Sequence, residues 1–182
     1  MKLLVVVDYQ KDFVDGTLGF PGAEGLDAGI AAKIRDYSRR GDYIVQTMDT
    51  HQADYLTTRE GKHLPVMHCI AGTDGWETYG RTAEAIAELA GNPRFRRIPK
   101  ATFPLHPRDM LDLMDWIGNH AITEIEFAGL VSHICVISNI CVFQGAYPNA
   151  QILVDPNLIA SYDPKAHAAV LEVMRTLQVQ LI

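Results

Sequence analysis

The sequence has few cysteines and no long apolar run, and both features limit its class. Its 182 residues contain three cysteines, an odd number that does not suit a framework of disulfide bonds. No apolar run approaches the ~18 residues that a membrane span needs, and the chain opens on a strand-like segment rather than a signal peptide. We therefore expect a cytoplasmic protein with reduced thiols and no membrane partner.

The sequence also lacks a basic run, which argues against nucleic acid as a partner. The formal net charge is −6, and basic residues cluster only in short pairs such as Arg39-Arg40 and Arg96-Arg97. Repeats and low-complexity segments are missing as well. The hydrophobic fraction of 48% is ordinary for a globular protein, and the length suits a single domain over residues 1–182.

Apolar runs and amphipathic segments alternate along the chain. The expected strands are Leu3–Val7, Tyr43–Met48, Arg94–Ile98, Ile122–Ala128, Gln151–Val154 and Val179–Ile182. The expected helices are Ala28–Arg40, Glu77–Ala90, Pro107–Ile117, Ile134–Gln144 and Pro164–Thr176. This alternation predicts a three-layer α/β fold, with a six-stranded, mostly parallel sheet and helices on both faces. The segment between positions 50 and 78 fits neither pattern, and a loop of that length is usually functional.

Reactive side chains follow the first four expected strands. Asp8, Asp49 and Lys100 come at or just after the ends of the first three, and Cys135 follows the fourth across a short segment. Because the carboxyl ends of parallel strands lie along one edge of the sheet, we expect these side chains to converge. A thiol, a carboxylate and an amine in contact suit nucleophilic catalysis on an acyl group.

The position of Cys135 allows two interpretations. It lies at or near the first turn of the expected helix, where unpaired N–H groups and a partial positive charge favour a thiolate and can bind an oxyanion. The alternative is a small buried structural residue, which is how most free cysteines behave. Cys141 follows six residues later on a different face of the helix, and we expect it in the core.

The long loop contains a second group of polar side chains. Asp49 and His51 are two positions apart in an extended segment and so face the same way, and His68 and Glu60 could add two further ligands. Imidazole and carboxylate donors suit a divalent metal, zinc first, with iron or manganese as alternatives. The alternative is an accident of spacing without a metal. His63 and His120 have no partner pattern and are expected on the surface.

Taken together, these residues resemble those of the isochorismatase-like cysteine hydrolases, and within them the nicotinamidases, along essentially the whole chain. Three segments carry the similarity to the catalytic motifs, namely Val7-Asp8-Tyr9-Gln10-Lys11-Asp12-Phe13, Arg97-Ile98-Pro99-Lys100 and Gly129-Leu130-Val131-Ser132-His133-Ile134-Cys135-Val136. The metal block of the nicotinamidases is matched by Asp49, His51 and the segment His68-Cys69-Ile70-Ala71-Gly72-Thr73.

The resemblance implies a role for each matched residue. Asp8, Lys100 and Cys135 would be catalytic, and a metal held by Asp49, His51, Glu60 and His68 would bind the pyridine nitrogen of the substrate. The resemblance further implies a non-proline cis peptide bond between Leu130 and Val131, with the backbone N–H groups of Val131 and Cys135 as oxyanion donors.

Two departures from the nicotinamidase pattern concern the substrate. His133 stands where an acidic residue is usual, and Lys100 is followed by Ala101-Thr102-Phe103-Pro104 instead of a glycine and a Ser-Ala-Phe-like element. Phe13, Tyr55 and Phe103 could supply an aromatic wall, and His133 is a further candidate for substrate contact.

The expected activity is hydrolysis of a small carboxamide, with nicotinamide as the leading candidate. One alternative is a related hydrolase acting on another small amide, such as an N-carbamoyl compound. Another is an inactive family member that only binds small molecules or proteins. A homo-oligomer is a further possibility, through Phe143, Tyr147 and the final strand.

Overall fold

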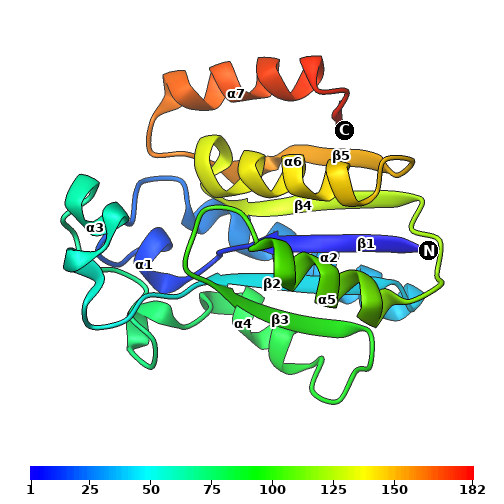
Figure 1. Cartoon of the computed structure of the whole chain (residues 1–182), viewed down its shortest axis with the longest axis horizontal. Helices are drawn as coiled ribbons and strands as arrows, with labels where there is room; N and C mark the ends of the chain where they lie inside the picture. The colour runs from blue at the N-terminus through cyan, green and yellow to red at the C-terminus, as the bar shows by residue number, and fades with distance from the viewer.

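The sheet is six-stranded and all its strands are parallel. A computed structural model describes residues 1–182 (Figure 1). The strands follow the order β3-β2-β1-β4-β5-β6, so that β1 is central and the chain reverses direction across the sheet between β1 and β4. Their bounds are β1 Lys2–Val7, β2 Tyr43–Asp49, β3 Phe95–Lys100, β4 Glu124–Leu130, β5 Gln151–Ala160 and β6 Gln180–Leu181.

Helices cover both faces of this sheet. One core cluster joins the sheet to α5, α6 and α7, and the other joins it to α2 and α4. Figure 1 shows α5 and α6 on the near face, with α1 and α3 gathered at the end where the strands finish. The helix bounds are α1 Lys11–Val14, α2 Asp27–Arg40, α3 Arg59–His63, α4 Gly80–Ala87, α5 Pro107–Ile117, α6 Ile137–Ala146 and α7 Pro164–Thr176.

The apolar run that opens the chain forms the centre of both layers. Leu3, Val5 and Val7 belong to one core cluster and Leu4 and Val6 to the other, and all five are fully buried. Successive side chains of a strand point to opposite faces, so a central strand covered by helices on both sides needs apolar residues throughout. The three-layer fold predicted from the alternation is confirmed.

The helix ends follow the local signals in the sequence. Helix α2 ends at Gly41, whose φ of 69° is left-handed and whose N–H group bonds to the carbonyls of Tyr37 and Ser38. Helix α7 begins after Asp163, whose carboxylate accepts the N–H groups of Lys165 and Ala166. The predicted Pro107–Ile117 and Pro164–Thr176 helices have the observed bounds.

Two predicted elements differ most in length from those of the structure. The fifth strand continues to Ala160 instead of ending at Val154, because its pairing with β4 resumes after a register shift that takes up the Asp155-Pro156-Asn157 stretch. The helix predicted over Glu77–Ala90 is shorter, Gly80–Ala87, because Thr78 is held in extended conformation by a bridge to Gln10.

Two side chains near the end of α6 are not where the sequence predicts them. Cys141 is exposed, so its assignment to the core is wrong. The two cysteines lie on different faces of the helix, as expected, but the face that carries Cys141 is exposed to solvent. Phe143 is fully buried in the core, so it is not available for a contact between copies of the chain.

The long loop between β2 and β3 contains short helical pieces that the sequence pattern misses. These are α3 and two single turns, Tyr55–Thr57 and Asp74–Trp76. None of the helices in the structure has both the length and the apolar character of a membrane span.

Candidate active site

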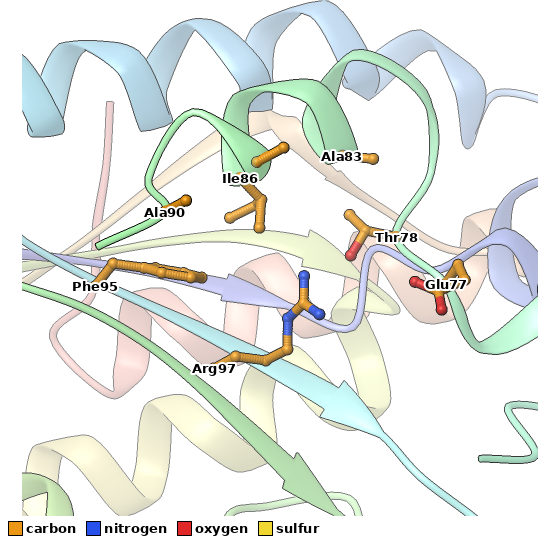
Figure 2. A pocket seen from close by; sticks show the side chains of 8 residues that line it. Glu77, Thr78, Ala83, Ile86, Ala90, Phe95 and Arg97 are labelled. Atoms are coloured by element: carbon orange, nitrogen blue, oxygen red, sulfur yellow. The ribbon is translucent and has the colours of Figure 1, made fainter. Parts of the chain in front are cut away.

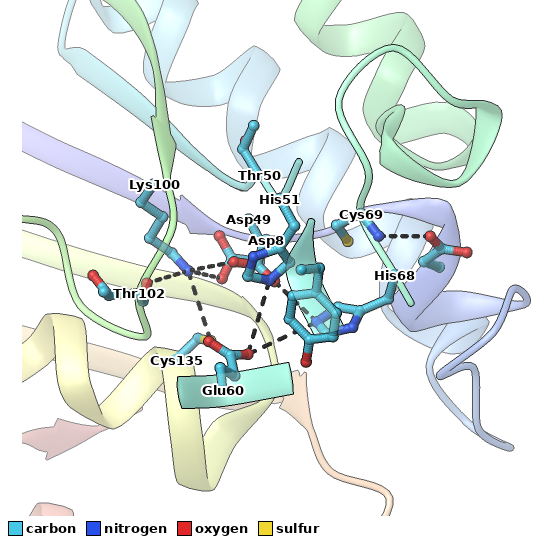
Figure 3. Close-up of polar contacts among 12 residues, drawn as sticks. Asp8, Asp49, Thr50, His51, Glu60, His68, Cys69, Lys100, Thr102 and Cys135 are labelled. Carbon is cyan, nitrogen blue, oxygen red and sulfur yellow. Dashed lines mark hydrogen bonds and ion pairs between the residues drawn. The ribbon is translucent and has the colours of Figure 1, made fainter. Parts of the chain in front are cut away.

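Asp8, Lys100 and Cys135 lie in contact at the carboxyl ends of the strands (Figure 3). The Nζ atom of Lys100 is 2.6 Å from Oδ2 of Asp8 and 3.7 Å from Sγ of Cys135. The same ammonium donates to the carbonyl oxygen of Thr102 at 3.1 Å. One buried cation therefore touches both the acid and the thiol.

The backbone around Asp8 turns its carboxylate inward. Its φ of 45° is uncommon for a residue other than glycine and marks a strained turn directly after β1. The hydroxyl of Thr47 donates to Oδ1 of Asp8 at 2.6 Å, and the Asp8 N–H group donates to the carbonyl of Thr47 at 3.2 Å. The second strand thus fixes the acid from both its main chain and its side chain.

The segment that carries Cys135 is a π-helix, Ser132–Val136, that leads into α6. The peptide bond before it, between Leu130 and Val131, is cis, at the position that the family resemblance implies. Single-turn π-helices of this kind are frequent at functional sites. The helical segment predicted over Ile134–Gln144 therefore begins two residues earlier, at Ser132, and its first turn is a π-helical turn that precedes α6.

Asn139 anchors this segment from the first turns of α6. Its amide donates to the carbonyl of Cys135 at 2.8 Å and to that of Phe103 at 3.1 Å, and it accepts the N–H group of Leu105 at 3.0 Å. The residue is fully buried, and a lone asparagine within an apolar helix had given no sequence signal of this role. It joins the nucleophile segment to the chain that follows Lys100.

Burial controls the protonation of the three side chains. It raises the pKa of the Cys135 thiol well above its usual range, although Lys100 acts in the opposite direction. Burial also raises the pKa of Asp8, against the lowering effect of Lys100 and Thr47. The pKa of Lys100 is raised despite its burial, because Asp8, Cys135 and Asp49 all favour the ammonium. Burial therefore outweighs the helix-end effect that would favour a thiolate, and the thiol needs a base to activate it.

Asp49, His51, Glu60 and His68 form a second group beside this centre. Their ligand atoms all lie within 4.8 Å of one another. The Nε2 atoms of His51 and His68 are 3.1 and 3.3 Å from Oδ2 of Asp49, and 3.8 and 3.9 Å from Oε1 of Glu60. Two imidazoles and two carboxylates thus converge on one point, as Figure 3 shows.

The donor set fits a divalent cation. The Nδ1 atom of His68 donates to the carbonyl of Val66 at 2.8 Å, which leaves the Nε2 lone pair of the neutral ring facing the Asp49 carboxylate. Two acceptor atoms in such contact repel each other unless a proton or a metal ion lies between them. His51, His68 and the charge of Lys100 lower the pKa of Asp49 despite its burial, so its carboxylate is ionised and able to coordinate.

Gln10 and Asp12 support the metal group from the segment after β1. Gln10 accepts the N–H group of Asp49 at 2.7 Å and donates to its carbonyl at 2.9 Å. Asp12 accepts the N–H group of Cys69, next to His68, at 2.7 Å. Both residues lie in the segment that carries the Asp8 motif, and that membership was the only sequence signal of their importance.

A cavity of about 430 Å³ opens onto Cys135 and the metal group. Phe13 and Phe103, two of the residues proposed for substrate contact, line it, and Val131 lies in its wall. The other lining residues, which the sequence did not indicate, are Thr17, Leu18, Gly19, Leu64, Ile134 and Tyr162. A wider cleft of about 1050 Å³ adjoins this cavity and shares Phe103 and Tyr162 with it.

Two predicted substrate contacts do not line the cavity around Cys135. Tyr55 is fully buried behind the ligands, with ring centroids 4.5 Å from His51 and 5.0 Å from His68. His133 bonds to Ser161 and is not among the residues that line this cavity. Tyr55 lines the wider cleft and packs against two histidines of the metal group, and His133 packs against Tyr162, so each contacts the cavity through another residue.

A separate groove of about 480 Å³ lies between α4 and the outer strands (Figure 2). Ile86 of α4 and Ala90, just after that helix, form one side of it, and Phe95 and Arg97 of β3 form the other. No thiol and no member of the metal group lines this groove.

The fold and the site define a protein of the isochorismatase-like α/β class, with a buried thiol, acid and amine at the carboxyl edge of a parallel sheet. The model of the isochorismatase domain matches residues 2–182. The chain belongs to the isochorismatase family.

Several characterised proteins are similar to it over nearly their full lengths. A nicotinamidase/pyrazinamidase from Mycobacterium tuberculosis is 27% identical, covering 100% of this chain and 98% of that one. The crystal structure of a nicotinamidase/pyrazinamidase from Bacillus subtilis superposes with a TM-score of 0.88 at 25% identity, covering 100% and 99% of the two chains. The fold is shared by a pyrazinamidase of Pyrococcus horikoshii whose structure was solved in complex with zinc. That structure superposes with a TM-score of 0.82 at 20% identity, covering 100% of this chain and 98% of that one.

Proposed function

We propose that this protein is an amidohydrolase that cleaves nicotinamide to nicotinate and ammonia through a thioester on Cys135. The contact of Lys100 with both Asp8 and Cys135 carries the proposal, because it brings a base, a cation and a nucleophile to one cavity. The names of the similar Mycobacterium tuberculosis and Bacillus subtilis proteins support an amide as substrate.

The first half of the reaction forms the thioester. Asp8 accepts the thiol proton of Cys135, and the resulting thiolate attacks the carboxamide carbon. The backbone N–H groups of Val131 and Cys135 donate to the oxyanion, each such donor being worth about 2.7–4 kcal/mol in comparable sites. The carbon–nitrogen bond then breaks as Asp8 returns its proton to the amine, and ammonia leaves.

The second half releases the acid. Asp8 accepts a proton from water, the hydroxide attacks the thioester carbon, and the carbon–sulfur bond breaks. The thiolate of Cys135 takes the proton back from Asp8, which restores the starting state. The charge of Lys100 stabilises the two anions that alternate during the cycle, the carboxylate and the thiolate.

We assign the metal group to substrate orientation. Asp49, His51, Glu60 and His68 would hold a divalent cation, zinc first and iron or manganese as alternatives, on the donor chemistry described above. A bound cation offers a coordination position to a pyridine nitrogen, directly or through water. Phe13 and Phe103 would then bind the faces of the ring.

The test of the activity is ammonia release from nicotinamide by the wild-type protein and by Cys135→Ala and Asp8→Asn. We expect turnover by the wild type and a loss of at least about 10³-fold in both variants, since neither can complete the acyl transfer. Cys141→Ala is the matched control and should retain full activity. Appreciable turnover by Cys135→Ala would refute the nucleophile assignment.

Metal content tests the second group separately. His51→Ala and Asp12→Ala should both lower the metal bound per chain, the first by removing a ligand and the second by releasing the Cys69 N–H group that orients His68. Elemental analysis after dialysis measures this without any substrate. Unchanged metal content in His51→Ala would remove the coordination proposal.

A related amide is the second candidate substrate, because His133 and the segment after Lys100 depart from the nicotinamidase pattern. A panel of nicotinamide, pyrazinamide and an N-carbamoyl amino acid in the same assay decides between them.

A further inference from the structure

Two consecutive side chains of the nucleophile segment bond to the chain that follows β5. The hydroxyl of Ser132 and Nδ1 of His167, on α7, are 2.9 Å apart. Nδ1 of His133 and the hydroxyl of Ser161 are 2.8 Å apart. The π-helix that carries Cys135 is thus tied at two adjacent positions to a segment about 30 residues later in the sequence.

Tyr162, next to Ser161, lines the cavity that contains Cys135 and also the wider outer cleft. Its ring packs edge-on against His133, with centroids 5.2 Å apart and planes at 73°. On the other side it meets Phe20 in the same manner, at 6.3 Å and 76°. Tyr162 nevertheless remains 58% exposed, so these two edge contacts and the chain before it set its position at the mouth of the cavity.

The hydrogen bonds around Ser161 indicate how His133 takes part. The hydroxyl oxygen of Ser161 accepts the N–H group of Asp163 at 2.9 Å, which leaves its proton free to donate to Nδ1 of His133. A neutral imidazole with a lone pair on Nδ1 accepts this proton, and a ring that carries a proton on Nδ1 would instead donate to the second lone pair of the hydroxyl. The titratable groups that act on His133 are Asp163 and His167, both from the start of α7, and Tyr162 packs against its ring.

We propose that His133 is a positioning residue that acts on the substrate through Tyr162. By its hydrogen bond to the Ser161 hydroxyl and its packing against the tyrosine ring, His133 holds Tyr162 as the outer wall of the catalytic cavity. This proposal rests on the proposed amidase function for its kinetic test. It also gives a role to the residue that departs from the nicotinamidase pattern.

Protonation of His133 reverses the direction of this hydrogen bond. An imidazolium carries a proton on Nδ1 and donates it to the second lone pair of the Ser161 hydroxyl, whose own proton then turns away. Burial and His167 lower the pKa of His133 and Asp163 raises it, with burial the largest influence, so the neutral form is the resting form at pH 7. The contact between His133 and Ser161 is therefore kept on acidification, and the effect of His133 on substrate retention should not depend on its charge.

The kinetic test compares His133→Leu and His133→Asn with the wild type. Leucine removes the acceptor, so KM should rise about fivefold to tenfold at pH 7.5 with kcat within about twofold. Asparagine presents its carbonyl oxygen near the position of Nδ1 and does not titrate. It should keep KM near the wild-type value, because its oxygen can still accept the Ser161 hydroxyl. His120→Asn, at an exposed histidine near Tyr43, is the control and should leave both KM and kcat unchanged.

A double-mutant cycle tests whether Tyr162 transmits the effect. Tyr162→Ala should raise KM by a similar factor, and the combination with His133→Leu should equal Tyr162→Ala alone. Multiplicative effects of the two substitutions would overturn the proposal. So would an unchanged KM in His133→Leu, or a KM in His133→Asn that is raised as much as in His133→Leu.

A measurement without substrate separates this proposal from the amidase assignment. In the wild-type protein the NMR signals of the Tyr162 ring should titrate with the pKa of His133, and in His133→Asn this titration should disappear. Absence of coupling in the wild type would overturn the inference, whether or not the protein releases ammonia. Absence of ammonia release with the coupling intact would refute the function and leave the positioning role standing.

Discussion

Replacement of Lys100 by methionine should destabilise the protein strongly, because the lysine neutralises a buried acid. Both side chains of the Lys100–Asp8 pair are 0% exposed, and their charged atoms are 2.6 Å apart. The ammonium also lies 3.7 Å from Oδ1 of Asp49. Methionine conserves the volume of the side chain, so the loss of charge dominates the effect.

The expected magnitude is a loss of about 3–5 kcal/mol in the free energy of unfolding, the range for removing one partner of a buried pair. Since a chain of this size shifts its melting temperature by about 2–4 °C per kcal/mol, the melting temperature should fall by roughly 6–20 °C. Lys2 provides the comparison. It pairs with Glu124 at nearly the same distance, 2.7 Å, but is 41% exposed, and exposed pairs contribute about 0–1 kcal/mol.

The assay is thermal unfolding followed by circular dichroism, for wild type, Lys100→Met and Lys2→Met. A chelator in every sample keeps metal binding from contributing to the differences. Activity should be lost in Lys100→Met and retained in Lys2→Met.

The pH dependence of the deficit provides a second criterion. Burial already places the pKa of Asp8 above its ordinary value, and removal of the Lys100 charge raises it further. A carboxyl group whose folded-state pKa exceeds its unfolded value binds a proton more tightly in the folded state, so folding is favoured at low pH. The deficit of Lys100→Met should therefore be largest at neutral pH and shrink as the pH falls toward the pKa of Asp8. A deficit no larger than that of Lys2→Met, or one that grows on acidification, would refute the reasoning.

Two further predictions concern glycine and cysteine positions. Gly129 has a φ of 118°, and an added Cβ would lie 2.0 Å from the carbonyl oxygen of Val7. Gly129→Ala should therefore lower the free energy of unfolding, measured by chemical denaturation, by about 3 kcal/mol or more. Gly145 has open space around it, so Gly145→Ala should be nearly neutral. Alkylation should label exposed Cys141 first, because burial and a raised pKa make the Cys135 thiol slow to react until the pH is raised. Mass spectrometry identifies the labelled residue. Modification of Cys135 before Cys141 at pH 7 would contradict a protonated Cys135 thiol.

Much of the site was predictable because it depends on local patterns and one topological rule. Short apolar runs identified the strands, and Asp8, Asp49 and Lys100 stood at their ends. Parallel strands place their carboxyl ends along one edge, so convergence followed without any knowledge of long-range contacts. Whether Asp8, Lys100 and Cys135 perform the assigned catalysis stays a prediction until the variants are measured.

Other features depend on groups that are distant in the sequence. The protonation of Cys135 follows from its complete enclosure by several elements, which outweighed the helix-end effect expected from its local position. The wall formed by Tyr162 depends on contacts with His133 and Phe20, far away along the chain.

By itself, the sequence determined the order of strands and helices, the ends of α2, α5 and α7, and the set of reactive residues at the edge of the sheet. Hydrophobic periodicity and capping are properties of neighbouring residues, so they can be read along the chain. Only the tertiary structure decided the exposure of Cys141, the length of β5, the anchoring by Asn139 and Gln10, and the walls of the cavity. Each of these depends on which distant side chains share one desolvated space, and the burial of a group and the hydrogen bonds available to it are properties of that space.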